Sequence, residues 1–370
     1  MTYVDEFRDA ARCRGVLSSI RALASRSWTI MEVCGGQTHG LLRWGIDEEL
    51  RGIVELLHGP GCPVCVAPAE TIDVAAELAM RKDTAMTTFG DMLRVPGSRD
   101  SLRLARARGG NVRTVYSPLD AVQLAKEHPE LQVVFFAVGF ETTAPATALA
   151  VQQAENQKLD NFSLLVAHVR VQPAMEMLTA DKDCPVDGFL AAGHVCTVAG
   201  YESYREFVNR FRLPVVVTGF EPVDLLYGIS DCVTQLEDGR AELVNCYARS
   251  AANEGNIRAR EIVNDVYEIC DRPWRGMGNV PDGGLQLHDR YAHFDAQHRF
   301  AVEELPVIQS NECRSGDVLA GRIKPTACEA FGSRCTPDSP LGAPMVSSEG
   351  ACAAYYRYAR GAADCQDVKT

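Results

Sequence analysis

The chain has 370 residues, which exceeds the size at which a single hydrophobic core usually keeps growing, so we expect two or three domains. Hydrophobic residues make up 46% and charged residues 23% of the chain, as in an ordinary globular protein. The formal net charge of -12 argues against a nucleic-acid partner and against an anionic membrane surface.

No apolar run is long enough to cross a bilayer, and the charged opening MTYVDEFRDAARCRG lacks the apolar segment of a signal peptide. These features predict a cytoplasmic protein. Fourteen cysteines in a reducing compartment do not indicate a disulfide framework. Some of them are therefore expected to be metal ligands or redox thiols.

Residues 1–30 are expected to form an N-terminal helical segment, and after it strand-like runs alternate with helix-like stretches. Eight apolar runs end in glycine or a small polar turn: WTIMEVCGG, GIVELLHGPG, TAMTTFGD, VRTVYSPLD, LQVVFFAVGFETT, FSLLVAHV, VDGFLAAGHV and LPVVVTGFEP. Nearly continuous apolar strands are typical of a parallel sheet that helices cover on both faces. The pattern predicts two Rossmann-like α/β domains, at residues 31–120 and 121–250.

Beyond residue 250 the alternation of strands and helices stops. The stretch NEGNIRAREIVNDVYEICD predicts one amphipathic helix, and the residues after it are rich in glycine, proline and turn formers. We expect an irregular C-terminal domain at residues 251–370, which needs something besides an apolar core to hold it together.

Four cysteines in this region could hold the domain together by binding a metal centre. They have the spacing C-x14-C-x6-C-x16-C and are Cys313, Cys328, Cys335 and Cys352. Four thiolates from one loop-rich segment can enclose zinc or an iron–sulfur cluster, and the long spacers favour the cluster. A set of buried free thiols is the alternative without a metal. Cys365 lies in a polar tail and has no assigned role.

Two further cysteine motifs follow predicted strands. Cys62 and Cys65 stand behind Gly-Pro-Gly, and their C-x2-C spacing suits a dithiol–disulfide couple, a metal clip or a structural disulfide. Cys34 is followed by two glycines, with His39 five residues on, and either binds a ligand or simply packs. Open α/β sheets build their sites at the carboxyl ends of parallel strands, so Cys34 and Cys62 are expected to face one cleft.

Seven motifs occur together and in the order of one known family: MEVCGGQTHG, HGPGCPVC, TFGDMLRVPGS, VGFETTAP, AAGHV, VTGFEPVDLL and MVSSEGACAAYY. From about Phe7 to Tyr358 the chain resembles the hydrogenase maturation factor HypD. Any one motif is a weak signal, whereas seven in the family's order are specific.

The resemblance implies a scaffold for assembly of the iron–cyanide–carbon monoxide unit of [NiFe]-hydrogenase. Such a protein holds one iron together with a small chaperone, HypC. Cyanide is delivered from HypE after HypF supplies the carbamoyl group, and the finished unit passes to the hydrogenase large-subunit precursor. The resemblance leaves open whether the chain is itself an enzyme.

The resemblance also assigns roles to residues. Cys34 is expected to hold the transferred iron, and the pair Cys62 and Cys65 is expected to be a redox centre linked to a [4Fe-4S] cluster. The four tail cysteines are the expected cluster ligands. The chemistry agrees, because a soft thiolate suits iron that carries cyanide and carbon monoxide. A dithiol can supply two electrons, and a cluster can replace them one at a time.

Polar residues at other strand ends complete the expected site. Glu141, Thr142 and Thr143, in GFETT, are expected to offer polar groups to cyanide or to a partner, with helix capping by a threonine as the alternative. Asp91 and His194 also follow strands. For each, an ordinary structural role is an equally good alternative to a role in the site: Asp91 as a helix cap, and His194 as a hydrogen-bonded loop histidine.

The sequence departs from the family at two positions. Gln37 stands where many relatives have histidine, and because glutamine cannot relay a proton at neutral pH, His39 becomes the better acid–base candidate. Ser315 stands where relatives often have cysteine, which leaves Cys313 as the nearest thiol and the least certain cluster ligand. Two other functions remain open: a thiol-disulfide oxidoreductase with an iron–sulfur cluster, and a structural zinc-bound binding module.

Overall fold

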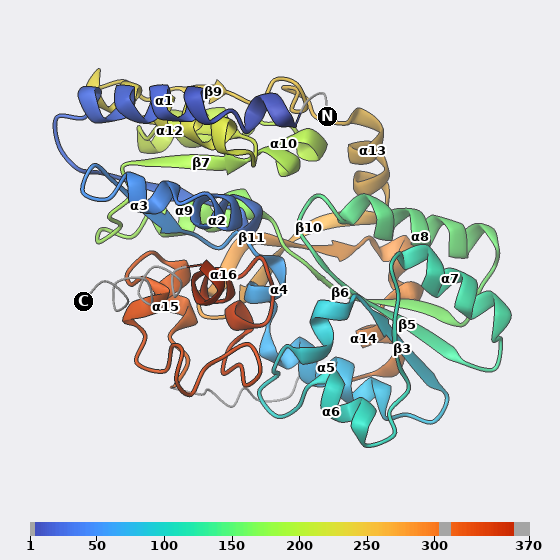
Figure 1. Cartoon of the computed structure of the whole chain (residues 1–370). Coiled ribbons are helices and arrows are strands. Elements are labelled where there is room, and N and C mark those ends of the chain that lie inside the picture. The colour runs from blue at the N-terminus through green and yellow to red at the C-terminus, as the bar shows by residue number, and fades with distance from the viewer. Residues whose placement is uncertain (1–3, 303–311, 359–370) are drawn as a thin grey trace.

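The computed structural model of the chain describes residues 4–302 and 312–358, so that Cys365 lies outside the described residues. Two parallel sheets form the two halves of the molecule in Figure 1. The first sheet has the order β2-β1-β7-β8-β9, with β1 (Trp28–Glu32), β2 (Val54–His58), β7 (Gly188–Ala192), β8 (Val215–Thr218) and β9 (Leu243–Asn245). The second has the order β4-β3-β5-β6, with β3 (Thr84–Thr88), β4 (Val112–Thr114), β5 (Gln132–Gly139) and β6 (Phe162–His168).

The predicted fold class is confirmed, since both sheets are parallel and helices pack on both faces. The predicted boundary near residue 120 is corrected. The chain forms β1 and β2 in the first sheet, crosses to build all of the second sheet, and returns for β7, β8 and β9. Apolar strands look alike in sequence whichever sheet they join, and this is why the interleaved order was not predicted.

The helices alternate with these strands along the chain. Their bounds are α1 (Ala10–Leu23), α2 (Gly35–Arg43), α3 (Ile46–Glu49), α4 (Pro63–Val66), α5 (Ala69–Ala79), α6 (Leu102–Ala107), α7 (Pro118–Glu127), α8 (Ala144–Asn156), α9 (Val171–Thr179), α10 (Gly193–Ala199), α11 (Tyr204–Phe211) and α12 (Pro222–Glu237). Two 3-10 turns, η1 (Asp5–Phe7) and η2 (Gly90–Arg94), complete this part.

Alternate residues of each strand enter different cores, as the two-residue repeat of a strand requires. In β1, Ile30 packs with α1, α2 and α12, whereas Met31 packs with α9 and α11 on the opposite face. In the second sheet, α5 and α6 cover one face and α7 and α8 the other. The N-terminal helix α1 is therefore part of the first half rather than a separate segment.

The C-terminal region contains more regular structure than expected. Helix α13 (Ile257–Val266) ends before Tyr267, and the rest of the predicted helix forms β10 (Tyr267–Trp274), which pairs antiparallel with β11 (Gly278–Leu287). Alternating burial along β10 shows why a strand replaces the helix there. The remaining elements are η3 (Asp289–Phe294), α14 (Ala296–Phe300), α15 (Ser315–Leu319), η4 (Pro325–Ala327), η5 (Ala343–Met345) and α16 (Ala351–Tyr358).

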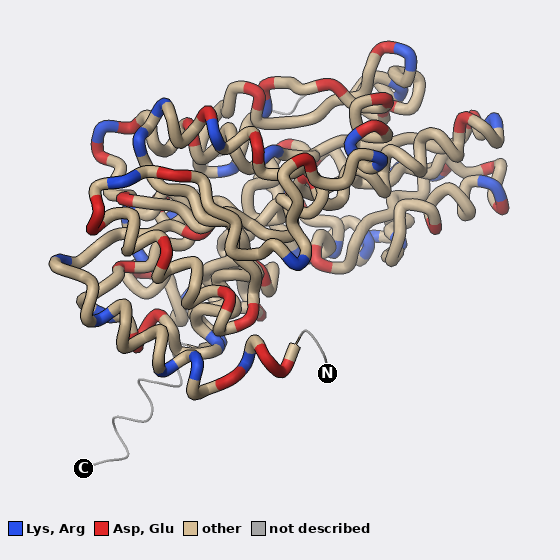
Figure 2. Tube along the Cα trace, turned by 90° about the horizontal axis from the view of Figure 1, so that it is seen from above, with Lys and Arg blue, Asp and Glu red and all other residues tan. Residues whose placement is uncertain are grey.

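Residues 312–358 form a small module against both halves. Helix α16 packs against α2, and η5 packs against α4, so that the tail meets the loops after β1 and β2. Acidic and basic residues are interspersed along the chain in Figure 2. Within the described ranges, no helix is long and apolar enough to span a membrane.

Candidate functional site

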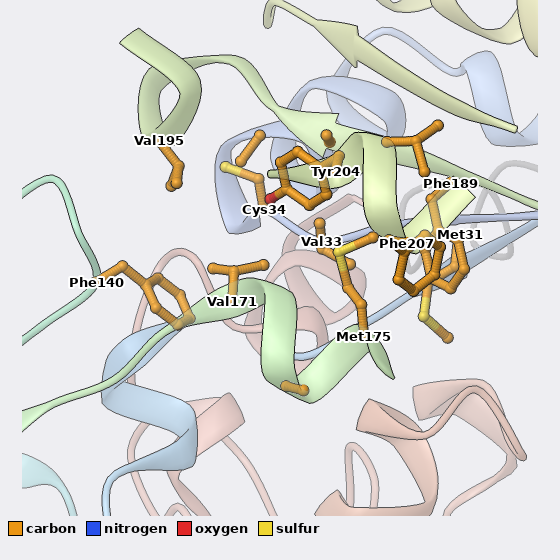
Figure 3. Packing of buried hydrophobic residues seen from close by; sticks show 14 of the residues in the cluster. Met31, Val33, Cys34, Phe140, Val171, Met175, Phe189, Val195, Tyr204 and Phe207 are labelled. Atoms are coloured by element: carbon orange, nitrogen blue, oxygen red, sulfur yellow. The ribbon is translucent and has the colours of Figure 1, made fainter. Parts of the chain in front are cut away.

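Cys34 lies between the end of β1 and the start of α2, where it is the residue that precedes the helix. It is only 2% exposed and packs among Val33, Val195 and Tyr204, as Figure 3 shows. Burial, and after it the nearby Glu32 carboxylate, raises the pKa of the Cys34 thiol. The thiol is therefore protonated at neutral pH, and a soft metal that binds the sulfur displaces this proton.

A histidine that follows the neighbouring strand of the same sheet faces this sulfur. His194, in the first turn of α10, places Nδ1 at 3.5 Å and Nε2 at 3.9 Å from Cys34 Sγ. Strands β1 and β7 are neighbours in the sheet, so their following loops meet. Burial lowers the pKa of His194, which keeps the ring neutral and able to accept a proton or bind a metal.

A buried polar network holds the Cys34 loop from behind. Glu32 accepts the backbone N–H of Cys34 at 2.8 Å and also accepts the Thr38 hydroxyl. The same carboxylate lies 2.8 Å from Nδ1 of His58, whose Nε2 lies 3.1 Å from the hydroxyl of Tyr355 in α16. The network ties the ends of β1 and β2 to the tail module.

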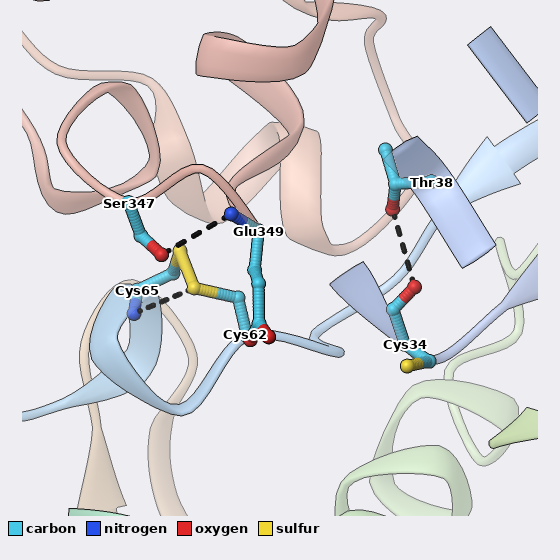
Figure 4. Close-up of a disulfide and its surroundings, with 6 residues drawn as sticks. All are labelled: Cys34, Thr38, Cys62, Cys65, Ser347 and Glu349. Atoms are coloured by element: carbon cyan, nitrogen blue, oxygen red, sulfur yellow. Dashed lines mark hydrogen bonds between the residues drawn. A yellow bond between two sulfur atoms is a disulfide. The ribbon is translucent and has the colours of Figure 1, made fainter. Parts of the chain in front are cut away.

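Cys62 and Cys65 are joined by a disulfide on the short helix α4, in the first crossing between the two sheets. Both residues are buried, and the N–H of Cys65 donates to Cys62 Sγ at 3.2 Å. The tail residues Ser347 and Glu349 lie beside this disulfide, whereas Cys34 lies farther from it (Figure 4).

The disulfide loop and the Cys34 loop are in direct contact. The N–H of Gly35 donates to the carbonyl of Gly61 at 2.9 Å. A Cβ atom at Gly61 would lie 2.2 Å from the backbone nitrogen of Cys34, and one at Gly35 would lie 2.3 Å from the carbonyl oxygen of Glu349. Only glycine fits these approaches, and the loops that carry Cys34 and Cys62 are therefore neighbours. Neither cysteine is among the residues that line the cavity between the sheets, so a shared cleft stays a prediction.

A cavity of about 520 Å³ opens where the strand ends of the two sheets face each other. Its wall includes His194 from the first sheet, Asp91 and Thr142 from the second, and Glu349 from the tail. Loss of hydration in the cavity and, after it, the Asp91 carboxylate raise the pKa of Glu349. Cys34 lies behind this wall, next to His194.

The GFETT residues divide between the cavity and the core. Thr142 and Thr143 line the cavity, and the Thr143 hydroxyl donates to the carbonyl of Phe140 at 3.1 Å rather than capping α8. Glu141 points away from it and accepts the N–H of Val171 at 3.1 Å. Its second oxygen is buried without a hydrogen-bond partner, and burial raises the pKa of this carboxyl.

Two residues of the Cys-Gly-Gly motif do not reach the cavity. His39 pairs with the Tyr358 hydroxyl at 3.0 Å and packs edge-on against its ring. Gln37 is buried and donates to the carbonyl of Ala191 at 3.1 Å, which fastens α2 to the end of β7. The histidine that accompanies Cys34 is thus His194 and not His39.

The four tail cysteines line one small cavity, together with apolar residues such as Phe331 and Met345. Burial and, after it, the proximity of the other three cysteines raise the pKa of Cys352. The N–H of Leu341 donates to Cys335 Sγ at 3.4 Å.

Four thiols placed around a cavity suit an iron–sulfur cluster, whose irons each take one cysteine. A single zinc ion needs all its sulfurs at about 2.3 Å from one point. Among the residues that the structure describes, no group of three or more His, Cys, Asp or Glu side chains is arranged to hold one metal ion.

Comparison with known proteins agrees with this architecture. The family model HypD, described as "Hydrogenase formation hypA family", matches residues 11–359. The chain belongs to the HypD family. It is 45% identical over 370 residues to hydrogenase maturation factor HypD2 of Bradyrhizobium diazoefficiens, an alignment that covers 97% of each chain.

Two further relatives of the HypD family give the same picture. The factor HypD of Azotobacter vinelandii is 45% identical over 369 residues, covering 97% of each chain. The factor HypD of Escherichia coli is 42% identical over 366 residues, covering 97% of this chain and 98% of the relative. The chain thus belongs to a family of hydrogenase maturation factors.

Sequence reasoning from the HypD-family motifs missed several residues of this site. Glu32, His58 and Tyr355 form the buried network, and Glu349 lines the cavity. A polar residue at the end of an apolar strand, as in MEVC and LLHG, was a usable signal for Glu32 and His58. Tyr355 and Glu349 carry no such signal, because their roles depend on where the tail folds back.

Proposed function

We propose that this chain is the scaffold on which the iron–cyanide–carbon monoxide unit of [NiFe]-hydrogenase is assembled. The observation that carries the proposal is the pair Cys34 and His194, which lies behind a cavity lined by strand ends of both sheets. One thiolate and one imidazole leave most positions of an iron open for diatomic ligands and for a partner. A storage site would instead enclose the metal fully.

The partners proposed for this step are those that the family resemblance implies. A HypC-type chaperone supplies further ligands to the iron at the mouth of the cavity, and HypE, charged by HypF, delivers cyanide there. The hydrogenase large-subunit precursor receives the completed unit. We place this work in the cytoplasm, where the eleven free cysteines of the described residues stay reduced.

Cyanide delivery from a thiocyanate-like donor requires a reductant. Cleavage of the donor's S–C bond takes two electrons and one proton, and it yields a thiol and cyanide. The dithiol form of Cys62 and Cys65 supplies two electrons and two protons as it closes to the disulfide, so one proton is left over. The close approach of Gly61 to the Cys34 backbone supports this step, because the loop that carries Cys62 adjoins the loop that carries the proposed iron ligand.

The tail cluster is proposed as a [4Fe-4S] cluster bound by Cys313, Cys328, Cys335 and Cys352. Such a cluster supplies electrons one at a time, as regeneration of the dithiol requires. Helix α4, which carries the disulfide, packs against η5, which adjoins the cysteine-lined cavity. This packing supports electron transfer between the proposed cluster and the disulfide.

A free-standing thiol-disulfide oxidoreductase is the second candidate, and the Cys62–Cys65 disulfide is the observation that favours it. Cys62 is 2% exposed and Cys65 is 0% exposed, so a foreign protein disulfide has no access to either sulfur. A buried pair suits a partner that is bound in the adjoining cavity. We therefore favour the scaffold.

Complementation tests this proposal. A bacterium that lacks its own HypD-family factor is supplied with this chain, and hydrogenase activity and large-subunit processing are measured. The native chain is expected to restore both, whereas Cys34→Ala is expected to restore neither at equal protein level. Full restoration by Cys34→Ala would contradict the scaffold, and restoration by a Cys62→Ser, Cys65→Ser chain would remove the redox role.

A further inference from the structure

Arg275 occupies the turn between β10 and β11, where it is bonded to the crossing that carries the disulfide. Its backbone N–H donates to the carbonyl of Val66 at 2.8 Å, directly after Cys65. Its guanidinium donates from Nε to the carbonyl of Ala67 at 3.0 Å and from Nη2 to the carbonyl of Pro96 at 2.7 Å. The hairpin turn therefore holds the end of α4 in place.

The same turn is fastened to the tail module. A Cβ atom at Gly276 would lie 2.8 Å from the Cα of Gly316, three residues after Cys313. Arg275 and Cys313 line one cavity of about 740 Å³. Arg275 is thus bonded to the segment that carries the disulfide, and it shares a cavity with a predicted cluster ligand.

The Arg275 side chain is half-buried at the wall of this cavity. Burial lowers the pKa of Arg275 to about 10, so the side chain remains a cation at neutral pH. Glu70 and Asp73 act on it with opposite charge, but Asp73 accepts four hydrogen bonds from residues 98–100. A half-buried cation acts on nearby charges more strongly than a fully hydrated one does.

We propose that Arg275 raises the reduction potential of the tail cluster and positions the disulfide helix beside it. The inference rests on the proposed function, because it assumes that Cys313 and its three companions hold the cluster. A fixed positive charge favours the more negative, reduced form of the cluster, and net charge is one of the protein's means of setting such potentials. The guanidinium is thus a positioning and tuning residue, not a catalytic one.

The electron balance shows why the potential matters. Reduction of the Cys62–Cys65 disulfide to two thiols takes up two electrons and two protons. The electrons arrive singly through the cluster from an external one-electron reductant, so two molecules of that reductant are oxidised for each disulfide opened. A tail cluster that is too hard to reduce stays oxidised, and the disulfide stays closed.

The test is an anaerobic redox titration of the cluster in the full-length protein, with viologen dyes as the one-electron reductant and visible absorption as the readout. In Arg275→Gln the ratio of reduced to oxidised cluster at a fixed ambient potential is expected to fall about tenfold, which is ~59 mV for one electron. Arg275→Lys keeps the charge and is expected to stay within about twofold of the native ratio.

Two matched variants separate the charge from general damage. Arg322→Gln removes a cation that lines the same cavity, but that side chain is 56% exposed and paired with Asp317 and Asp181, so no change is expected. Glu70→Gln removes an anion that acts on Arg275 and is expected to raise the reduced-to-oxidised ratio.

The outcomes are distinct. An unchanged ratio in a fully loaded Arg275→Gln protein would overturn the role of Arg275, as would an equal fall in Arg275→Lys. If the Arg275→Gln protein does not bind the cluster, Glu70→Gln decides instead. An unchanged reduced-to-oxidised ratio in Glu70→Gln overturns the role of Arg275, and a raised ratio supports it. Absence of iron and sulfide from the native protein counts against the proposed function itself.

Discussion

The sulfur of Cys34 lies 3.5 Å from Nδ1 of His194, although 160 positions separate the two residues in the sequence. The contact exists because the chain builds the second sheet between β2 and β7 and then returns to the first. Strand β7 pairs directly with β1, and both loops open toward the cavity between the sheets. The candidate site thus forms from two segments that sequence order keeps apart.

His194→Ala is expected to weaken iron binding by roughly 10- to 100-fold, as loss of a group that orients or joins a metal's ligands typically does. The protein should fold normally and keep its tail cluster. Anaerobic iron titration of the protein with a HypC-type chaperone measures the effect. His39→Ala is the matched control, because its imidazole bonds Tyr358 and lies away from the cavity. A weaker affinity in the control alone would show that the wrong histidine has been assigned.

Cys62 and Cys65 are expected to change oxidation state together. After isolation in air, alkylation and mass mapping should find both protected, and after mild anaerobic reduction both should be labelled, because they form one disulfide. Cys270, a half-buried free thiol, serves as the reference, since its labelling should be the same before and after reduction. Full labelling of Cys62 and Cys65 in the air-isolated protein would rule out the couple.

Cys335→Ala is expected to abolish binding of the tail cluster and to lower the stability of residues 312–358, because metal binding and folding are coupled in small modules. The protein should change from brown to colourless, with loss of four iron atoms per chain. Cys270→Ala is again the matched control, as Cys270 lies outside the cysteine-lined cavity. Stoichiometric zinc in a colourless native protein would contradict the cluster and support the zinc-bound module.

Acidification is expected to destabilise the second half of the molecule through His168. Burial lowers the pKa of His168 to about 4, from a usual value of about 6.5. The unfolded chain therefore binds a proton first as the pH falls, so stability is lost between about pH 6.5 and pH 4 and is fully present above that window. The loss is on the order of 3 kcal/mol.

Denaturant unfolding of the native chain and of His168→Gln at pH 7 and pH 4.5 isolates this contribution. The variant loses the contacts of His168 with Thr147 and Gly139, so it should be less stable at pH 7. Its stability should nevertheless fall less on acidification than that of the native chain. Parallel losses in the two proteins would mean that His168 keeps its ordinary pKa.

The sequence predicts the class of fold and the loops that carry the chemistry, because apolar runs that end in glycine identify parallel strands and their carboxyl ends. Cys34, Cys62 and Thr142 are found at such ends. Which strands share a sheet is set by pairing between distant segments, and no local pattern in the sequence records it. The boundary near residue 120 failed for this reason, and the approach of His194 to Cys34 was not predicted for the same reason.

The C-terminal region shows a second limit of prediction from sequence, which concerns the choice between helix and strand. The stretch after Val266 has helical composition, yet Tyr267 is buried against the second sheet and the strand that starts there pairs with β11. Tertiary burial outweighs helix propensity, which differs by only about 0.7 kcal/mol among ordinary residues. The role of Arg275 in the turn of this hairpin is invisible in sequence, because its partners are backbone carbonyls of a distant segment.

The infrared spectrum of the complex with a HypC-type chaperone, isolated anaerobically from cells that also contain HypE and HypF, tests the central claim most directly. The native complex is expected to show bands of iron-bound cyanide and carbon monoxide. The Cys34→Ala complex is expected to form through its other contacts, to keep the tail cluster and to lack those bands. Bands of normal position and intensity in the Cys34→Ala complex would contradict the claim that Cys34 holds the iron.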